Sequence, residues 1–318
     1  ALPISCSPDG SLGERLLAMA VRAVLLWRLS DWRPRGRGSV ASLRDMAPFS
    51  VSLMLTDLIS TFYMKLPQFF LGKLYPTATL GAFDQAVKLK DMPVTAATQS
   101  VQSVTFPALS EVRGDAPKFA ESYRQVVLIT AYVMFPAMLG LSAVAHDLFA
   151  LLLSEKWMPT VPYFEVVCLA GLFYPVGMIC YNVLKVMSRG PLIVRLEVVK
   201  KLLMTVVFAV TIPHSVTAVV WGLVVIAFGE MAVNFLATRR FTRFTTRRFL
   251  RTLLPVALVS GTMYLLVRLT ACAVPGHLLL RLAAQLLVGA AAYVGLSVLF
   301  RLEAFGLLCD LMKKQAAR

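Results

Sequence analysis

Charged residues are scarce in this chain, and those present mostly avoid its long hydrophobic runs. They make up 15% of the 318 positions, whereas hydrophobic residues make up 58%, and the mean hydropathy is +0.72. The surface of a water-soluble domain needs charges distributed along every element. The composition therefore excludes a soluble globular protein and predicts an all-α, polytopic bundle of transmembrane helices.

Cysteine and histidine are too few and too scattered to build a metal or redox site. The cysteines show no paired or metal-like spacing, and the three histidines stand alone near expected helix ends. We interpret the cysteines as small core hydrophobes. No metal ion and no cofactor are expected. The five cysteines are Cys6, Cys168, Cys180, Cys272 and Cys309.

Sequence motifs of catalysis are missing as well. The chain has no glycine-rich phosphate loop, no zinc-protease motif, no serine-hydrolase elbow and no cysteine–histidine pair at a plausible spacing. The carboxylates are scattered over several expected helices, so the sequence does not indicate where an active site would form. We expect no enzymatic activity. Without a nucleotide-binding fold, transport must draw on an ion gradient, on the membrane potential or on the substrate's own gradient.

The hydrophobic runs predict about nine membrane crossings, each near the usual ~20 residues. The segment 146–157 is too short to cross, and we expect it to lie at the interface with Trp157 as its anchor. Arg268 and Arg281, near the outer ends of the last two spans, are predicted to extend toward lipid head groups. The expected spans are 12–29, 47–71, 80–107, 125–145, 162–187, 192–212, 216–238, 252–272 and 277–300.

Basic residues predict the orientation of these spans. Lys and Arg total 32 against 17 Asp and Glu, and they gather in alternate connections. By the positive-inside rule those connections are cytoplasmic. The Arg- and Phe-containing stretch 238–251 looks like a nucleic-acid-binding patch, but it lies between two spans. We interpret it as a loop that contacts anionic lipid, and no nucleic-acid partner is expected.

The stretch 80–110 carries a polar stripe on a membrane-length helix. Its polar side chains recur at three- and four-residue steps, which places them on one helical face. A charge facing lipid would cost about 2.5–3.5 kcal/mol, so the stripe is expected to face a water-filled cavity or other protein groups. The segment 47–71 repeats the pattern. The stripe residues are Asp84, Lys88, Asp91, Thr95, Thr98 and Gln102.

Purely structural roles compete with this interpretation. Lys88 is four residues from Asp84 and three from Asp91, so an ion pair within the helix is an equal alternative to ligand binding. Asp57 and Lys65 can likewise pair with a neighbouring helix. Glu197, with the lysines that follow it, is interpreted as interfacial.

Six stretches of the sequence, taken in order, resemble one transporter family. They are WRP, SLRDMAPFS, LGKLYPTATLGAFDQAVKLKDMP, VQSVTFPALSEVRGD, SEKW and SRG. Together they are similar to lipopolysaccharide and O-antigen flippases, the Wzx-like polysaccharide transporters of the multidrug/oligosaccharidyl-lipid/polysaccharide exporter superfamily. The resemblance implies a MATE-like fold with two helical lobes around a cavity and a trailing helix pair.

Mapped onto that fold, the chain is expected to lack most of the first lobe. Residues 1–30 resemble the last helix of that lobe, and 47–238 resemble the six-helix second lobe. The remaining expected parts are a basic cytoplasmic loop at 31–46, a second one at 239–251, a trailing transmembrane pair at 252–300 and an amphipathic cytoplasmic tail at 301–318.

The resemblance implies that the protein flips undecaprenyl-pyrophosphate-linked oligosaccharide across the bacterial inner membrane for surface polysaccharide synthesis. Expected partners are this lipid-linked oligosaccharide, membrane lipids and the glycan polymerase or assembly machinery. Alternatives are a MATE-like cation-coupled antiporter and a membrane-embedded glycan polymerase or ligase. The candidate cavity residues are Asp57, Thr61, Lys65, Gln68, Asp84, Lys88, Lys90, Asp91, Thr95, Thr98, Gln99 and Gln102.

Overall fold

The computed structural model of the chain describes residues 8–29, 58, 61–63, 65–153, 155–187, 190–242, 244–273 and 277–308. The chain divides into two compact units, Ala1–Leu55 and Thr56–Arg318. The described part of the first unit is helix α1 (Pro8–Leu29), which contains the predicted span 12–29. Large apolar side chains of α1, such as Leu25 and Leu26, are exposed. Such a surface suits a helix surrounded by lipid.

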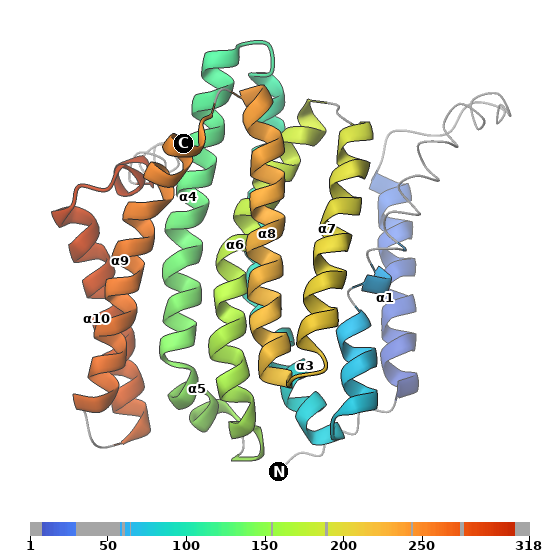
Figure 1. Cartoon of the computed structure of the whole chain (residues 1–318), viewed down its shortest axis with the longest axis vertical. Coiled ribbons are helices and arrows are strands. Elements are labelled where there is room, and N and C mark those ends of the chain that lie inside the picture. The colour runs from blue at the N-terminus through green and yellow to red at the C-terminus, as the bar shows by residue number, and fades with distance from the viewer. Residues whose placement is uncertain are drawn as a thin grey trace, which may run out of the picture. The chain divides into compact units, whose positions relative to one another are not determined.

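The second unit is a bundle of long helices, and none of its described residues forms a strand (Figure 1). The all-α prediction is confirmed. Residues 65–74 are helical and contain Pro67 of the expected span 47–71. The helices that follow are α3 (Thr77–Glu111), α4 (Ala116–Ala143), α5 (Ala145–Leu152), a short 3-10 helix η1 (Glu155–Thr160), α6 (Val161–Val186), α7 (Gly190–Thr211), α8 (Val216–Thr242), α9 (Thr246–Ala273) and α10 (Leu278–Leu299).

Helix α4 begins nine residues before the predicted span at 125–145, inside a stretch that reads as a polar connection. Asp115 accepts a hydrogen bond from the backbone N–H of Lys118 at 3.1 Å, and Pro117 lies in the first turn. Both features favour the start of a helix. The carboxylate accepts a hydrogen bond from a backbone N–H that has no partner within the helix, and proline has no N–H that would need one. The hydrogen bond from Lys118 also lowers the pKa of the Asp115 carboxyl.

Five described helical segments are long and apolar enough to cross a membrane by length and composition alone. Helices α3 and α7 are long enough but are not in that set, and they carry five and four charged residues. They are the helices on which a charged surface inside a membrane protein would be found. The five are Ala116–Ala143, Glu155–Val186, Val216–Thr242, Thr246–Ala273 and Leu278–Leu299.

Helix α6 lies at the centre of the second unit and packs against α3, α4 and α8. Gly177 permits the close approach of α8, since a Cβ at this position would lie 3.1 Å from the Cα of Met231. The Asn234 amide donates to the Gly177 carbonyl at 3.2 Å, which joins the same two helices. A polar bond beside a glycine contact is a common way for membrane helices to associate.

The short segment between α4 and α6 is confirmed as non-spanning, because α5 and η1 have only 8 and 6 residues. Trp157 is half-buried and packs against an apolar cluster that includes Phe164 of α6 and Phe83 of α3. The structure therefore gives Trp157 a packing role within the protein.

Helices α9 and α10 pack on each other, and α9 also packs on α4. The prediction that Arg268 and Arg281 extend toward lipid head groups is wrong. Arg268 donates to Glu165 of α6 at 2.9 Å, and the Arg281 Nε donates to Asp147 of α5 at 2.7 Å. Both arginines instead fasten the trailing pair to the helices before it.

Candidate functional site

The polar stripe of α3 remains on one helical face and is largely accessible. Lys88, Thr95 and Gln99 are exposed, and Gln102 is half-buried. Phe83, Ala86 and Val94, on the neighbouring faces, are buried against other helices. Helix α3 thus uses its apolar faces for packing and leaves most of its polar face open.

Lys88 is not held by either carboxylate that the sequence offers it. No ion pair or hydrogen bond of its side chain occurs within the described residues, and Asp91 pairs instead with Lys90 at 2.5 Å. The Lys90 side chain is mostly buried, whereas the Asp91 side chain is half exposed. An exposed ammonium group in the middle of α3 is therefore available to an anion.

Thr98 and Asp84 differ from the rest of the stripe. Thr98 is only 7% exposed, and its hydroxyl donates to the Val94 carbonyl at 2.6 Å. Thr98 lies at the edge of the polar face that is next to Val94, so it contacts protein. Asp84 is half-buried and has one carboxylate oxygen that is enclosed without a hydrogen-bond donor among the described residues.

The helical residues before α3 carry part of the second predicted stripe. Lys65 and Thr61 are exposed and Gln68 is half-buried. Asp57 lies outside the described residues. The Thr205 hydroxyl of α7 donates to the Tyr63 hydroxyl at 3.2 Å. The side of this helix that carries Tyr63 therefore lies beside α7.

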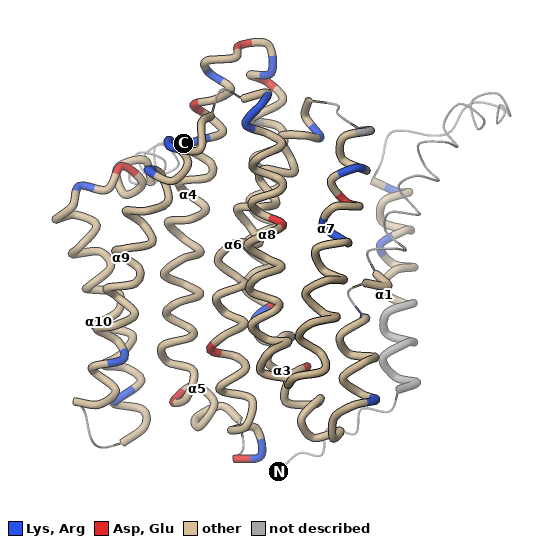
Figure 2. Tube along the Cα trace, in the orientation of Figure 1, with Lys and Arg blue, Asp and Glu red and all other residues tan. Residues whose placement is uncertain are grey.

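Helix α7 adds a charged group whose burial the sequence did not reveal. The Lys200 ammonium forms an ion pair with Glu197 one turn earlier, and its side chain is only 8% exposed. It also lies 5.1 Å from the ring centre of Tyr181 on α6. The interpretation of Glu197 and its lysines as interfacial fails for Lys200, because α6 and α8 cover it. In Figure 2, acidic and basic residues follow one another along this part of α7.

Three carboxylates from three helices interact electrostatically with one tyrosine of α6. Asp91 of α3, Glu197 of α7 and Glu230 of α8 all lie close enough to the Tyr174 hydroxyl to interact with it electrostatically. Glu230 is half-buried and has no hydrogen bond or ion pair within the described residues. In the sequence, the three-residue spacing of Glu197 and Lys200 indicates an ion pair in this region.

The α3 stripe therefore continues across α6 toward α7 and α8. We call this set the polar surface: Lys88, Asp91, Thr95, Gln99, Gln102, Tyr174, Glu197, Lys200, Lys201 and Glu230. It combines ammonium groups, hydroxyls, amides and aromatic rings, and the Lys201 ammonium lies 5.6 Å from the Tyr63 ring centre. Such groups bind phosphates and sugar hydroxyls. No group of metal-binding side chains occurs within the described residues.

Comparisons with known proteins agree with the predicted resemblance. A family model described as "Polysaccharide biosynthesis protein" matches residues 12–162. An uncharacterized membrane protein in the cps region of Klebsiella pneumoniae is 24% identical over 236 residues, which is 71% of this chain and 47% of that protein. The lipopolysaccharide biosynthesis protein WzxC of Escherichia coli is 25% identical over 164 residues, which is 51% of this chain and 33% of WzxC. The chain thus spans about half, or less, of the length of these curated relatives.

The fold has a solved counterpart. The lipid II flippase MurJ, in an inward closed conformation, aligns with a TM-score of 0.67 over 84% of this chain and 57% of MurJ, at 13% identity. The predicted fold class is confirmed by this likeness. The sequence matches confirm the resemblance to Wzx-like polysaccharide transporters. Together with the apolar helices, they also support the predicted location as a multi-pass protein of the bacterial inner membrane.

Proposed function

We propose that this Wzx-like protein moves undecaprenyl-pyrophosphate-linked oligosaccharide from the cytoplasmic to the outer leaflet of the bacterial inner membrane. The observation that carries the proposal is the polar surface on α3, α7 and α8. Its exposed ammonium group at Lys88 lies on α3, which packs against the membrane-spanning helices α4 and α6. A charge at that place is costly unless it serves an aqueous pathway.

The substrate's chemistry matches this arrangement. Its polyprenyl tail can remain among lipid chains, while a head group of many hydroxyls and an anionic pyrophosphate needs a wet and basic passage. Lys88 and Lys65 would balance phosphate charge, with Lys90 as a third cation if its pair with Asp91 opens. Thr95, Gln99 and Gln102 would exchange hydrogen bonds with sugar hydroxyls.

The remaining candidate residues have supporting roles in the proposal. Thr61 and Gln68 would extend the hydrogen-bonding surface along the helix before α3, and Asp84 and Asp57 would limit its net positive charge. Thr98 would contribute only after its bond to Val94 breaks. Rocking of two lobes would expose the polar surface to each side of the membrane in turn. The glycan polymerase or assembly machinery would receive the flipped product.

A cation-coupled antiporter is the second candidate function, and Glu230 favours it. A half-buried carboxylate that interacts electrostatically with Glu197 can bind a cation. Against it stand Lys88 on the polar surface and Lys65 on the helix before α3, because both are basic and repel cations. Less supports the alternative of a glycan polymerase or ligase, because the solved counterpart is named a flippase and the sequence shows no catalytic motif.

Substitution of Lys88 tests the proposal. In a strain that depends on this protein for glycan export, Lys88→Ala should lower surface polysaccharide at least tenfold and leave lipid-linked precursor on the cytoplasmic side. Protein abundance in the membrane should not change. Lys156→Ala is the matched control, because Lys156 is an exposed lysine in η1, away from the polar surface. Normal export by Lys88→Ala would refute the role of this lysine.

A further inference from the structure

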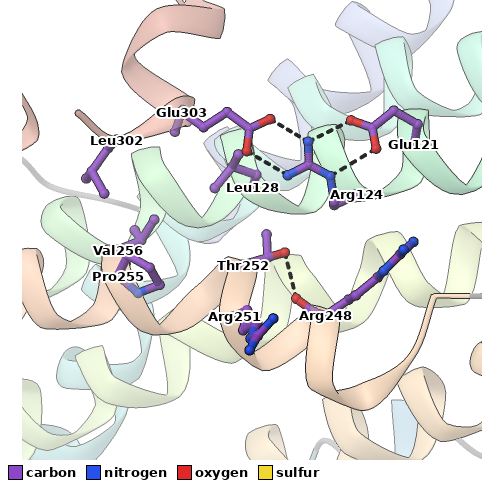
Figure 3. Close-up of a pocket in the computed structure, with 11 residues that line it drawn as sticks. Glu121, Arg124, Leu128, Arg248, Arg251, Thr252, Pro255, Val256, Leu302 and Glu303 are labelled. Carbon is purple, nitrogen blue, oxygen red and sulfur yellow. Dashed lines mark hydrogen bonds and ion pairs between the residues drawn. The ribbon is translucent and has the colours of Figure 1, made fainter. Parts of the chain in front are cut away.

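We propose that a pocket formed by α4, α9 and residues 302–304 binds the phosphate group of an anionic membrane lipid. The pocket has a volume of about 460 Å³, within the range of small-molecule sites. It is separate from the polar surface described above, because neither α3, α7 nor α8 contributes to it. Figure 3 shows its charged and apolar side chains together.

Arg124 of α4 forms hydrogen bonds with both carboxylates of the pocket. Its guanidinium donates to Glu303 at 2.8 Å and to Glu121 at 2.6 and 3.1 Å, so the group lies between two acids (Figure 3). A second bond to Glu303 completes a two-pronged pair. The bonds from Arg124 lower the pKa of the Glu303 carboxyl, so Glu303 is ionised at neutral pH. One guanidinium thus bonds two carboxylates, and the three groups together keep a net charge of −1.

Arg248 and Arg251 of α9 add two positive charges to the pocket, and Arg248 also interacts electrostatically with Glu121. Both are exposed, and neither guanidinium has a hydrogen bond or ion pair within the described residues. The two arginines are three residues apart and therefore lie on the same side of α9, where both line the pocket. Pro255, one turn after Arg251, lines it as well. With three arginines and two glutamates, the pocket carries a net positive charge. Each of these two guanidinium groups can bind a phosphate through paired hydrogen bonds.

The other walls identify the ligand as a lipid. Leu128, Pro255, Val256 and Leu302 give the pocket an apolar side next to its arginines. Its four charged residues on α4 and α9 lie in the first three turns of these membrane-spanning helices, at the end of the bundle where basic residues gather (Figure 2). Head-group phosphates lie at that depth, and the cytoplasmic leaflet is rich in anionic lipid. A soluble phosphate would gain nothing from the apolar walls.

Lipid titration of the purified 318-residue chain in a neutral detergent tests the site. Native mass spectrometry would count bound phosphatidylglycerol, with phosphatidylcholine as the uncharged comparison and inorganic phosphate as a competitor. The double variant Arg248→Gln/Arg251→Gln should bind phosphatidylglycerol roughly tenfold more weakly than the wild type. Millimolar inorganic phosphate should not displace the lipid.

The matched control is Arg240→Gln/Arg247→Gln, which removes the same charge from the same loop region at exposed positions outside the pocket. This variant should keep wild-type binding. An equal loss in both double variants would mean that only general surface charge attracts the lipid, and would overturn the proposal. Displacement by inorganic phosphate would overturn the choice of a lipid. If the double variant does not fold, Arg251→Gln against Arg247→Gln carries the same comparison.

Discussion

Arg281 of α10 and Asp147 of α5 form an ion pair across 134 residues of sequence, and the Asp147 side chain is only 4% exposed. Gln285, one turn after Arg281, donates a further hydrogen bond to the same carboxylate at 2.8 Å. Burial alone would raise the pKa of Asp147, but the bonds from Arg281, His146 and Gln285 outweigh it and lower the pKa. The trailing helix pair is thus fastened to the rest of the second unit by a charged carboxylate.

Asp147→Asn should therefore destabilise the protein substantially. The change keeps the shape of the side chain but leaves Arg281 without its charged partner, and breaking a buried pair costs about 3 kcal/mol. Thermal unfolding in detergent would measure the loss. Asp115→Asn is the control, because Asp115 is partly exposed and asparagine caps a helix nearly as well. Equal stability of the two variants would contradict the role given to the Arg281 pair.

The contact of α6 with α8 predicts a different kind of sensitivity. Gly177→Ala should destabilise the protein by about 1–3 kcal/mol, because the new methyl group would lie 3.1 Å from the Met231 backbone. Gly261→Ala on α9 should be tolerated, since a Cβ there meets nothing within 4 Å. Unfolding midpoints of the two variants provide the comparison. A harmless Gly177→Ala would mean that the two helices are less closely packed than described.

The pair of Glu197 and Lys200 should show energetic coupling. Lys200→Met leaves a carboxylate unpaired in a covered position, so it should reduce stability and transport, while Glu197→Gln together with Lys200→Met should restore part of the stability. A double-mutant cycle of unfolding measurements should give about 1–3 kcal/mol of interaction. Additive effects of the two substitutions would show that the residues do not act as a pair.

Local periodicity made much of this structure predictable. The helix containing residues 80–107 and its polar face follow from spacing alone, because side chains three and four residues apart share a face. The pairing of Arg281 with Asp147 could not be predicted, since nothing local links residues 134 positions apart. The same limit explains Lys200, whose burial depends on how α6 and α8 pack around α7.

The accessibility of some candidate residues depends on how a helix is rotated about its own axis. Lys88 and Thr98 belong to one stripe in sequence, but Lys88 is exposed and Thr98 is buried. The stripe is wide enough for one edge to contact α6 while the rest stays open. Spacing places residues on a face but does not show which edge of that face a neighbouring helix will cover.

The most direct test of the account is the reaction of single cysteines with a water-soluble thiol reagent, in the membrane and after replacement of the native cysteines. Lys88→Cys on α3 and Leu265→Cys on α9 are the informative pair, because both side chains are exposed but only Lys88 lies on the polar surface. If the polar surface lines a water-filled path, Lys88→Cys should react rapidly and Leu265→Cys should not. A protected Lys88→Cys, or equal reaction at both positions, would contradict the proposed path.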